Sequence, residues 1–341
     1  MKDPKKKRDV IVAAHGGGGE MTKRLLESRI LPGITNPALA PLTDGAVLDL
    51  PPGRLVVSTD AHVIRPIEFP GGDIGRLAVC GTVNDVAMMG ARPLALALAL
   101  VLEEGLDLAV LERIMRSVAE SAEEAGVSIV TGDTKVVEKG HGDGIYITTT
   151  GVGVVAPGVS LDAARIRRGD VLIVNGSIAE HGLAIMAARE RLGIQSSLKS
   201  DVAPLGGLVQ RMLETRADVK FLRDPTRGGI AGVVADLAET TGLTVEVREA
   251  DVPVSPNARH AAEALGLDPL TVANEGKLVA VVPQGDAERV LAACREFEHG
   301  RDAAVIGRLV EAELPLAELV TRIGGRRIIQ RPSGAELPRI C

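Results

Sequence analysis

Aromatic side chains are scarce in this chain. Its 341 residues include no tryptophan, one tyrosine and three phenylalanines, so a surface that stacks the bases of single-stranded nucleic acid is not expected. A formal net charge of -6 provides no broad basic face for phosphate backbones or anionic lipid. Hydrophobic residues make up 45% of the chain, and with so few rings among them the core must consist of aliphatic side chains. We therefore expect no nucleic-acid partner and no membrane partner.

Cysteine is also rare, with three residues, Cys80, Cys294 and Cys341. An odd number without a CxxC pair or paired histidines argues against a disulfide framework and a structural zinc site. Cys80 and Cys294 lie in apolar helical patterns and are predicted to be small buried hydrophobes. The longest apolar run, residues 94–102, has about half the length of a membrane span, and residues 10–14 are too short for the core of a signal peptide. These features predict a cytoplasmic protein.

The length of the chain favours two domains, each large enough to bury a core. Residues 156–170 contain a proline, a glycine and a charged stretch, which is typical of a domain boundary. The last residues have no periodicity and are predicted to form a mobile tail. The predicted division is 1–42 for an N-terminal glycine-rich loop and connector, 43–156 for an N-terminal domain, 157–327 for a C-terminal α/β domain and 328–341 for the tail.

Strand and helix patterns alternate through both predicted domains, which places the chain in the α/β or α+β class. The clearest helix covers residues 106–125, where apolar side chains recur at helical spacing and Gly126 provides a left-handed C-cap. Strand 94–102 carries no polar residue, so both of its faces should be covered, one of them by a partner subunit or a second sheet. The other predicted helices are 20–28, 73–89, 180–191, 228–239, 257–265 and 286–297, and the other strands are 46–50, 55–59, 127–131, 145–155, 171–174, 244–247, 278–282 and 303–310.

Three aspartates follow or interrupt apolar stretches. Asp60 comes after Leu-Val-Val-Ser-Thr, Asp133 comes after Ile-Val-Thr-Gly, and Asp85 interrupts a largely apolar helix. A buried carboxylate costs roughly several kcal/mol unless it is paired or binds a cation. Each one taken alone is compatible with a turn cap or an arginine partner. Together, and with Asp44 as a fourth, they predict a site for Mg2+, which prefers carboxylates and substrate phosphates.

Two glycine-containing segments are typical of phosphate binding. The run 15–19, which includes Gly17 and Gly18, can surround an anion with backbone N–H groups because glycine tolerates positive φ, and a flexible linker is the alternative. No Gly-Lys-Ser/Thr follows it, so it is not a Walker sequence. The segment 224–229, Asp-Pro-Thr-Arg-Gly-Gly, opens a predicted helix and so places Arg227 at a positive helix end, although an ordinary capped helix start has the same pattern.

Cys341 is the last residue of the sequence and lies on a tail with nothing to bury it. An exposed free thiol is chemically reactive, so its presence indicates a function. The alternative is that the chain ends in cysteine by chance. A CaaX prenylation box would require cysteine at the fourth position from the end, where Pro338 stands. Lys135 and Glu275 lie in polar breaks between apolar strands, where a single charge usually means a solvated loop.

Taken together, these segments resemble the HypE family of hydrogenase-maturation proteins, within the aminoimidazole ribonucleotide synthetase-like (PurM-like) superfamily. The resemblance covers nearly the whole chain. Most of its motifs are shared by several ATP-using enzymes of the superfamily, whereas the ending Pro-Arg-Ile-Cys is specific to HypE. The resembling segments are 15–19, 58–61, 71–93, 131–137, 224–229, 273–277 and 338–341.

The resemblance implies a two-domain fold, a homodimer in which the N-terminal domains of two subunits pair into a β-barrel, and an ATP site shaped by both domains. It implies an ATP-dependent carbamoyl dehydratase that converts an S-carbamoyl group on Cys341 to a thiocyanate, the source of the cyanide ligand of nickel–iron hydrogenases. Lys135 and Glu275 would take part in proton transfer. The carbamoyltransferase HypF and the iron-scaffold proteins HypC and HypD would be its partners.

The resemblance also implies which residues meet ATP and Mg2+. The residues expected to bind ATP or its phosphates are Asp60, Asp85, Asp133, Asn84, Gly17, Gly18 and Arg227. The acids expected at the metal are Asp44, Asp60, Asp85 and Asp133.

Two other interpretations stay open at this point. The first is a superfamily kinase or synthetase that acts on a small diffusible substrate such as thiamine phosphate. The second is a non-catalytic scaffold whose tail docks on partner maturation proteins. The glycine loop has no cysteine, which counts against a selenophosphate synthetase. Deletion of Cys341 would separate the first alternative from HypE, since a kinase would keep its turnover.

Overall fold

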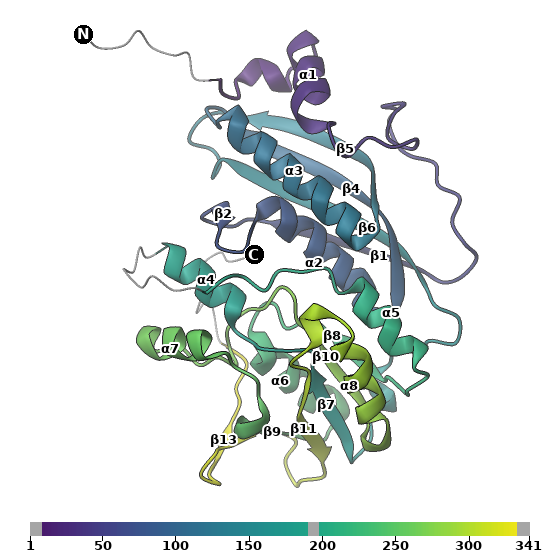
Figure 1. The fold of residues 1–341 in the computed structure, drawn as a ribbon, viewed down its shortest axis with the longest axis vertical. Coiled ribbons are helices and arrows are strands. Elements are labelled where there is room, and N and C mark those ends of the chain that lie inside the picture. Colours follow the sequence, from purple (N-terminus) through teal and green to yellow (C-terminus); the bar gives the residue numbers. More distant parts are fainter. Residues whose placement is uncertain (1–8, 190–197, 333–341) are drawn as a thin grey trace.

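The computed structural model describes residues 9–189 and 198–332 and arranges them as two α/β domains preceded by an N-terminal segment (Figure 1). This segment contains η1 (Ala13–Gly16), α1 (Glu20–Leu25) and η2 (Leu26–Ile30). The prediction of a strand at residues 46–50 is wrong. Val47 is 96% exposed, and no β-bridge joins this stretch to the rest of the described chain, because an alternating pattern forms a strand only where a neighbouring strand provides backbone partners.

The N-terminal domain is a four-stranded sheet with helices on one face (Figure 1). The parallel pair is formed by the last two strands in the order, and the other pairs are antiparallel. The strand order is β1 (Leu55–His62), β6 (Ile145–Val155), β4 (Ala91–Glu103) and β5 (Ser128–Val137). The covering helices are α2 (Ile74–Met88) and α3 (Leu108–Ala125), and the hairpin of β2 (Glu68–Phe69) and β3 (Gly72–Asp73) leads into α2.

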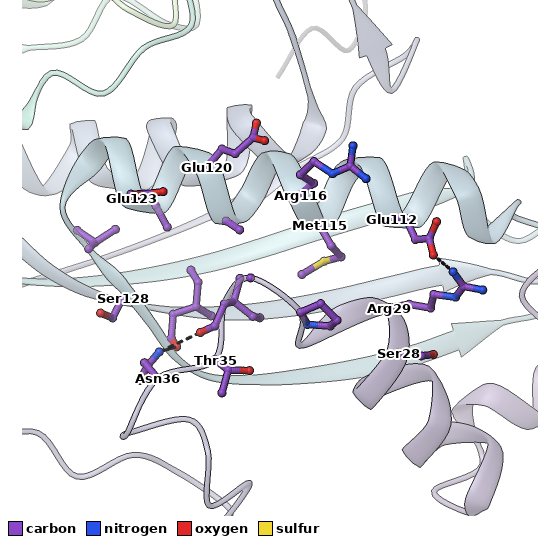
Figure 2. A pocket seen from close by; sticks show the side chains of 17 residues that line it. Ser28, Arg29, Thr35, Asn36, Glu112, Met115, Arg116, Glu120, Glu123 and Ser128 are labelled. Atoms are coloured by element: carbon purple, nitrogen blue, oxygen red, sulfur yellow. Dashed lines mark hydrogen bonds and ion pairs between the residues drawn. The ribbon is translucent and has the colours of Figure 1, made fainter.

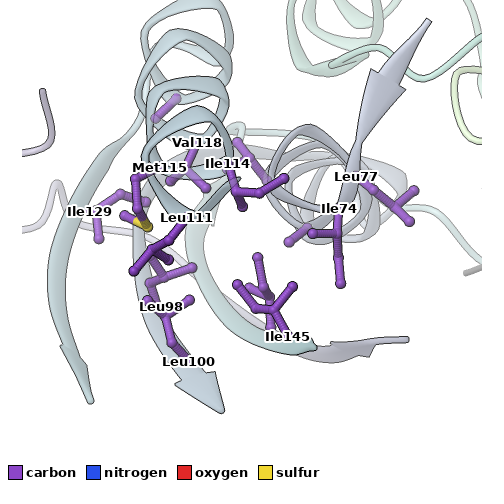
Figure 3. Packing of buried hydrophobic residues seen from close by; sticks show 14 of the residues in the cluster. Ile74, Leu77, Leu98, Leu100, Leu111, Ile114, Met115, Val118, Ile129 and Ile145 are labelled. Carbon is purple, nitrogen blue, oxygen red and sulfur yellow. The ribbon is translucent and has the colours of Figure 1, made fainter. Parts of the chain in front are cut away.

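Helix α3 confirms the clearest helix prediction. Asp107 caps its first turn, because Oδ1 accepts a hydrogen bond of 2.8 Å from the backbone N–H of Ala109. Gly126 ends the helix with φ +68°, in the left-handed region. Between these caps, an apolar stripe belongs to one buried cluster with the facing side chains of the sheet (Figure 3). The stripe consists of Leu111, Ile114, Met115 and Val118.

The opposite face of this sheet is only partly covered by the described residues. Val57 of β1 is 65% exposed, and Ala97, Ala99 and Val101 of β4 are half-buried. Strand β4 therefore has one face buried under α2 and α3, as its apolar pattern predicts. The described residues of one chain do not fully cover its other face.

The C-terminal domain is a seven-stranded mixed sheet with helices on both faces. Its helices are α4 (Glu180–Arg189), α5 (Gly206–Glu214), α6 (Gly229–Thr241), α7 (Pro256–Leu265) and α8 (Ala287–Arg295). Leu172 and Val174 of β7 belong to a core cluster with α4, α6 and α7, while Val171 and Ile173 belong to a cluster with α5 and α8, because successive side chains of a strand point to opposite faces. The strand order is β13 (Arg326–Ile328), β12 (Ala317–Val320), β9 (Thr244–Arg248), β11 (Ala304–Val310), β7 (Asp170–Val174), β10 (Val279–Pro283) and β8 (Phe221–Arg223).

Every helix and strand predicted for the C-terminal domain is present, with ends shifted by a few residues. Helix α5 and the strands β8, β12 and β13 were not predicted. The three strands are four residues or fewer, and α5 begins with two glycines, so none of these elements has the length or the start signal that a periodic pattern needs.

Helix α2 joins the two domains. It is buried along almost its whole length, which explains its all-round apolar sequence. Ala87 and Met88 near its end belong to the core cluster that α5 and α8 form in the C-terminal domain. Polar residues on α2 therefore lie between the domains.

The core of α3 provides a test of the packing. Replacement of the fully buried Leu111 by alanine is expected to lower the free energy of unfolding by about 2–5 kcal/mol, through lost burial and a cavity. The same change at Leu314, which is 71% exposed, should cost less than about 0.5 kcal/mol. Urea unfolding of both variants measures the difference, and equal losses would contradict the described core.

Candidate active site

A cavity of about 180 Å³ lies where the two domains meet. Its walls come from β1, α2, the segment before α6 and the segment before β10. Carboxylates dominate the lining, beside one guanidinium group. The lining residues are Asp60, Gly81, Asp85, Asp224, Thr226, Arg227 and Glu275. Residues far apart in the sequence thus form one acidic pocket.

Neighbouring polar groups hold Asp60 and Asp85. Oδ2 of Asp60 lies 3.2 Å from Nε2 of the buried His62, and Oδ1 accepts a hydrogen bond of 2.8 Å from the N–H of Ala61. Burial opposes ionisation of Asp60, but these partners outweigh it and keep its pKa below the ordinary value. Asp85 accepts a hydrogen bond of 2.8 Å from Ser58 Oγ, yet burial and the charge of Asp60 raise the pKa of Asp85.

Glu275 is buried at the cavity wall with an unpaired oxygen. Its Oε1 has no hydrogen-bond partner among the described residues. Its backbone is held on both sides, since its N–H donates to Asp201 Oδ1 and its C=O accepts from Asn84 Nδ2, each at 3.1 Å. Burial, and then the charges of Asp224 and Asp201, raise the pKa of Glu275 well above its ordinary value. A buried carboxyl group of this kind is a candidate for proton transfer.

Asp224 and Arg227 precede helix α6. Burial, and then the charge of Asp85, raise the pKa of Asp224 to about 7. The positive charge of Arg227 favours the ionised form of Asp60. Gly228, with φ +77°, turns the chain into the helix. The N–H groups of Gly229 and Ala231 donate to the carbonyl oxygens of Thr226 and Leu270, so it is the positive dipole end of α6, beside Arg227, that suits an anionic group in this cavity.

Asn84, which the resemblance predicts to bind ATP, does not line this cavity. Its Nδ2 donates to the carbonyl oxygens of Ala203 at 3.0 Å and Glu275 at 3.1 Å, and its Oδ1 accepts from the N–H of Leu205 at 2.7 Å. Both N–H groups of its amide are thus bonded to the backbone. The side chain joins α2 to two segments of the C-terminal domain, and so supports the wall behind the cavity.

Asp133 does not reach this cavity within one chain. The strand register connects Asp133, through Ala99 and Thr148, to the sheet face of Ala61. Asp60 is the next residue along β1 and therefore points to the other face. Of the three aspartates predicted to converge, Asp60 and Asp85 line the acidic cavity within one chain and Asp133 does not.

Lys135, two residues further along β5, shares the face of Asp133, and its Nζ lies 2.8 Å from Asp133 Oδ2. The hydrogen bond from Lys135 lowers the pKa of Asp133. Gly17 and Gly18 directly follow η1, which contacts β5, and Gly18 has φ +76°. Asp44 lies in the exposed connector, beside a second cavity of about 200 Å³ that also borders Asp133. These residues form a second group, separate from the acidic cavity.

A groove of about 700 Å³ runs between η2, the turn after it and α3 (Figure 2). Arg29 and Glu112 form an ion pair across it, and Asn36 Nδ2 donates to the carbonyl of Ile129 at 2.7 Å. None of the predicted site residues lines it. The groove is larger than the acidic cavity but lacks convergent reactive groups.

Comparison with known proteins decides the family. The chain matches the models of the AIR synthase related protein, N-terminal domain, over residues 42–155 and C-terminal domain over residues 167–315. It is 50% identical over 327 residues to the carbamoyl dehydratase HypE of Azotobacter vinelandii, with 96% of each chain covered. The chain belongs to the HypE carbamoyl dehydratase family.

Solved HypE structures have the same fold. A crystal structure of HypE in complex with ATP is 42% identical, with a TM-score of 0.93 and coverage of 97% of this chain and 99% of that one. A crystal structure of a HypE–HypF complex is 41% identical, with a TM-score of 0.79 and coverage of 92% and 100%. The predicted family and two-domain fold are confirmed. The described part of this HypE family member contains no helix long and apolar enough to cross a membrane.

The cavity of this HypE family member fits a hard cation that is shared with a phosphate. Mg2+ is commonly held by one or two carboxylates plus substrate phosphates. Asp60 and Asp85 provide such carboxylates, and the crowding that raises the pKa of Asp85 would be relieved by a cation. Within the described ranges, no three His, Cys, Asp or Glu side chains are grouped to hold a metal. The donor set therefore does not form an all-protein metal cage.

Two acids near Glu275 were not predicted as site residues. Asp224 stands first in the segment 224–229, one of the segments that resemble the HypE family, and an acid shortly before a glycine-rich helix start was the available signal. Asp201 lies in an irregular stretch before α5 and has no motif or periodicity. Only the fold brings it to Glu275.

The raised pKa of Asp224 makes stability depend on pH. Because the pKa of Asp224 in the folded chain, about 7, exceeds its ordinary value of 3.8, the folded chain binds more protons than the unfolded chain between these values, and stability falls as pH rises through this window. Asp224→Asn removes the buried negative charge that destabilises the folded chain at high pH. This change should raise Tm by about 2–6 °C at about pH 8, with little effect near pH 4, where Asp224 is protonated in the folded chain.

Thermal unfolding at both pH values measures this effect. Asp133→Asn is the control, since the pKa of Asp133 is lowered and the neutral side chain should give no gain at about pH 8. A stabilisation of Asp224→Asn that is equal at both pH values would contradict the assignment.

Proposed function

We propose that this chain uses ATP to dehydrate an S-carbamoyl group on its own Cys341 to an S-cyanate, with ADP and phosphate as products. The product would supply the cyanide ligand of nickel–iron hydrogenases. The observation that carries the proposal is the interdomain cavity, in which four carboxylates lie beside Arg227 at the start of α6. Phosphoryl transfer requires mainly alignment and charge stabilisation, and proton transfer requires a buried acid or base. The cavity combines both.

The phosphates of ATP would lie at the N-terminal end of α6. The positive end of the α6 dipole and the Arg227 guanidinium would provide positive charge there. Mg2+ would be held by Asp60 and Asp85 together with the phosphates, and would offset the negative charge of the transferred group. The HypE relative solved with ATP supports nucleotide binding.

The carbamoyl oxygen is a poor leaving group until it is phosphorylated. Its attack on the γ-phosphorus forms a new O–P bond and releases ADP, while one N–H proton is lost. In the elimination that follows, the second N–H proton leaves, the C–O bond breaks, phosphate departs and a C≡N triple bond remains. The Glu275 carboxylate would accept a proton from nitrogen, and its burial and raised pKa support this role.

The described end of the chain supports delivery of Cys341 to the cavity. Pro332 lies against Gly228, the residue after Arg227, and a Cβ on Gly228 would be 3.5 Å from Pro332 Cδ. Arg331 forms ion pairs with two acids of α6, Asp236 and Glu239. Cys341 lies outside the described residues, nine positions beyond Pro332. Nine residues span at most about 30 Å, which is enough to reach into the cavity.

Lys135 and the glycine loop require a second subunit in this proposal. The partly exposed apolar face around Val57 would pack against the same face of another copy, so that the two sheets form a β-barrel. Asp133 and Lys135 lie on that face and would approach the cavity of the partner. Each active site of the homodimer would then combine residues of two chains.

The proposed substrate comes from a partner enzyme. HypF would load the carbamoyl group onto Cys341, and the solved HypE–HypF complex of relatives supports this pairing. HypC and HypD would accept the cyanide on iron. The cytoplasmic location predicted from the sequence stays a prediction.

The mass of Cys341 tests the reaction. Carbamoylated protein incubated with ATP and Mg2+ should lose about 18 Da, one water, at Cys341 as ATP is consumed. Cys341→Ala should neither gain the carbamoyl group nor lose water, while Cys80 and Cys294, which are buried, should stay unmodified. ATP-dependent turnover of a small molecule by Cys341→Ala at the normal rate would overturn the proposal.

The dimer is tested at Val57. Val57→Asp places a charge on the exposed apolar face and should convert the dimer to monomers and lower dehydration at least about tenfold, because a charge buried at an interface without a partner is costly. Leu314→Asp, at a similarly exposed apolar position outside this sheet, should leave the oligomeric state and the rate of dehydration unchanged. Light scattering after size-exclusion chromatography reports the mass, and a monomeric wild type with full activity would exclude the shared site.

A further inference from the structure

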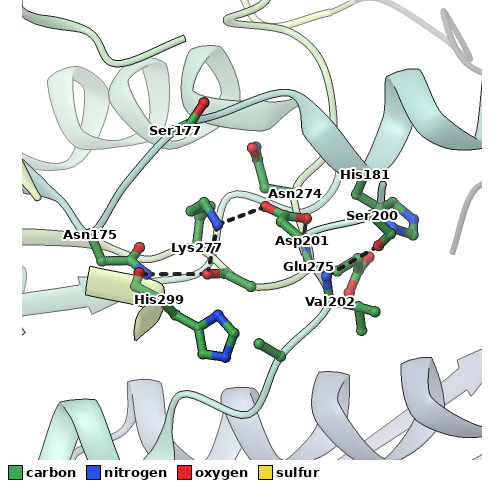
Figure 4. Close-up of polar contacts among 12 residues, drawn as sticks. Asn175, Ser177, His181, Ser200, Asp201, Val202, Asn274, Glu275, Lys277 and His299 are labelled. Atoms are coloured by element: carbon green, nitrogen blue, oxygen red, sulfur yellow. Dashed lines mark hydrogen bonds and ion pairs between the residues drawn. The ribbon is translucent and has the colours of Figure 1, made fainter. Parts of the chain in front are cut away.

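A buried ion pair lies directly behind Glu275 (Figure 4). Lys277 Nζ is 3.2 Å from Asp201 Oδ2, and the two side chains are only 7% and 2% exposed. Lys277 also donates to the carbonyl oxygen of Gly276 at 3.3 Å. The other oxygen of Asp201 accepts the backbone N–H of Glu275 at 3.1 Å. One carboxylate therefore connects the lysine to the residue that faces the cavity.

The two segments that carry this pair are in tight contact. A Cβ on Gly276 would lie 1.8 Å from the carbonyl oxygen of Asp201, so no other residue fits between Glu275 and Lys277 without moving the chain. Asn84 holds the following peptide group, through the Glu275 carbonyl. The backbone of Glu275 is thus fixed from both domains, although its side-chain Oε1 has no hydrogen-bond partner among the described residues.

The pair does not reach the acidic cavity itself. Asp201 and Lys277 border a different polar cavity of about 280 Å³, and the lining residues of the two cavities do not overlap. A group bound beside Asp60 and Arg227 would therefore not touch the pair. Any effect of the pair on the reaction must pass through Glu275.

We propose that Asp201 and Lys277 are positioning residues for Glu275: Asp201 fixes the Glu275 backbone by its hydrogen bond, and Lys277 provides the charge that lets Asp201 stay buried there. This inference rests on the proposed role of Glu275 in proton transfer. Removal of one partner leaves a buried charge without compensation, which disturbs the segment. When both charges are removed, two variants can be compared that differ only in whether residue 201 accepts the hydrogen bond from the Glu275 N–H.

Two double variants isolate that hydrogen bond. Asp201→Asn with Lys277→Met has no unpaired charge and keeps an oxygen that can accept from the Glu275 N–H. Asp201→Leu with Lys277→Met has no unpaired charge, a similar volume and no acceptor. The measurements are kcat for ATP-dependent dehydration of carbamoylated protein, KM for ATP and the thermal midpoint of unfolding.

The leucine variant is expected to lose about 10²-fold in kcat, the usual effect of a reactive group displaced by about 1 Å. Its KM for ATP should stay within about twofold, because the pair does not border the acidic cavity. The asparagine variant should recover to within about fivefold of the wild-type kcat. Equal kcat values in the two double variants, or equal losses in kcat and ATP affinity, would overturn the inference.

The chain offers a matched control pair. Lys220 and Asp170 are also buried, with 2.8 Å between Nζ and Oδ2, and Asp170 also accepts a backbone N–H, from Arg167 at 2.7 Å. Asp170 pairs with Pro283, at the far end of β10 from Glu275. The double variants Asp170→Asn with Lys220→Met and Asp170→Leu with Lys220→Met should lower the thermal midpoint as their counterparts do, and should leave kcat within about twofold of the wild type.

Glu275→Gln separates failure of this inference from failure of the proposed function. If Glu275→Gln dehydrates at the wild-type rate, Glu275 is not the proton acceptor and the proposed mechanism fails. If Glu275→Gln is inactive while both Asp201 double variants match the wild type, only the positioning role fails. A further outcome is that the double variant Asp201→Leu with Lys277→Met unfolds below the assay temperature while Asp170→Leu with Lys220→Met stays folded. That result would show that Asp201 and Lys277 serve folding, and it would overturn the inference.

Discussion

The hydrogen bonds of the Asn84 side chain tie the two domains together at the site. One amide on α2 binds the backbone of Ala203, Leu205 and Glu275, so the N-terminal domain holds both the segment before α5 and the segment that carries Glu275. Because the polar groups of the Asn84 side chain are buried, the loss of any one of these hydrogen bonds would lower the free energy of unfolding by about 1–3 kcal/mol. The acidic cavity exists because this contact keeps Asp85, one residue further along α2, opposite the acids of the second domain.

The cavity concentrates like charges in a poorly solvated space. Burial and neighbouring carboxylates raise the pKa values of Asp85, Asp224 and Glu275, whereas hydrogen bonds offset burial at Asp60. Such an arrangement reduces stability and persists only where the surrounding structure enforces it. The fold enforces it through the apolar packing of α2 against both domains. Carboxyl groups with different proton affinities are what a reaction with both metal binding and proton transfer requires.

The predicted site residues lie on opposite faces of the sheet of the N-terminal domain and so form two groups. Asp60 and Asp133 both lie on strands of that sheet, yet alternation along the strands directs them to opposite sides. A residue pattern that is read along one chain cannot show this division, because a shift by a single position reverses the face of a side chain. The proposed homodimer on the exposed face would bring the two groups together without any change in the fold of one chain.

The amino-acid sequence alone determined the fold class, the family and most of the elements, since capped helices such as α3 and apolar strands such as β4 have local signals. It also indicated Asp60, Asp85, Arg227 and Glu275, because their motifs are continuous in the chain. Only the tertiary structure decided that Asn84 joins α2 to the C-terminal domain and that Asp201 binds the backbone of Glu275. It also decided that Asp133 lies on the sheet face opposite to Asp60. These facts depend on strand register and on contacts between residues 74 to 191 positions apart in the sequence. Such contacts form when the core packs, and they leave no periodic pattern in the sequence.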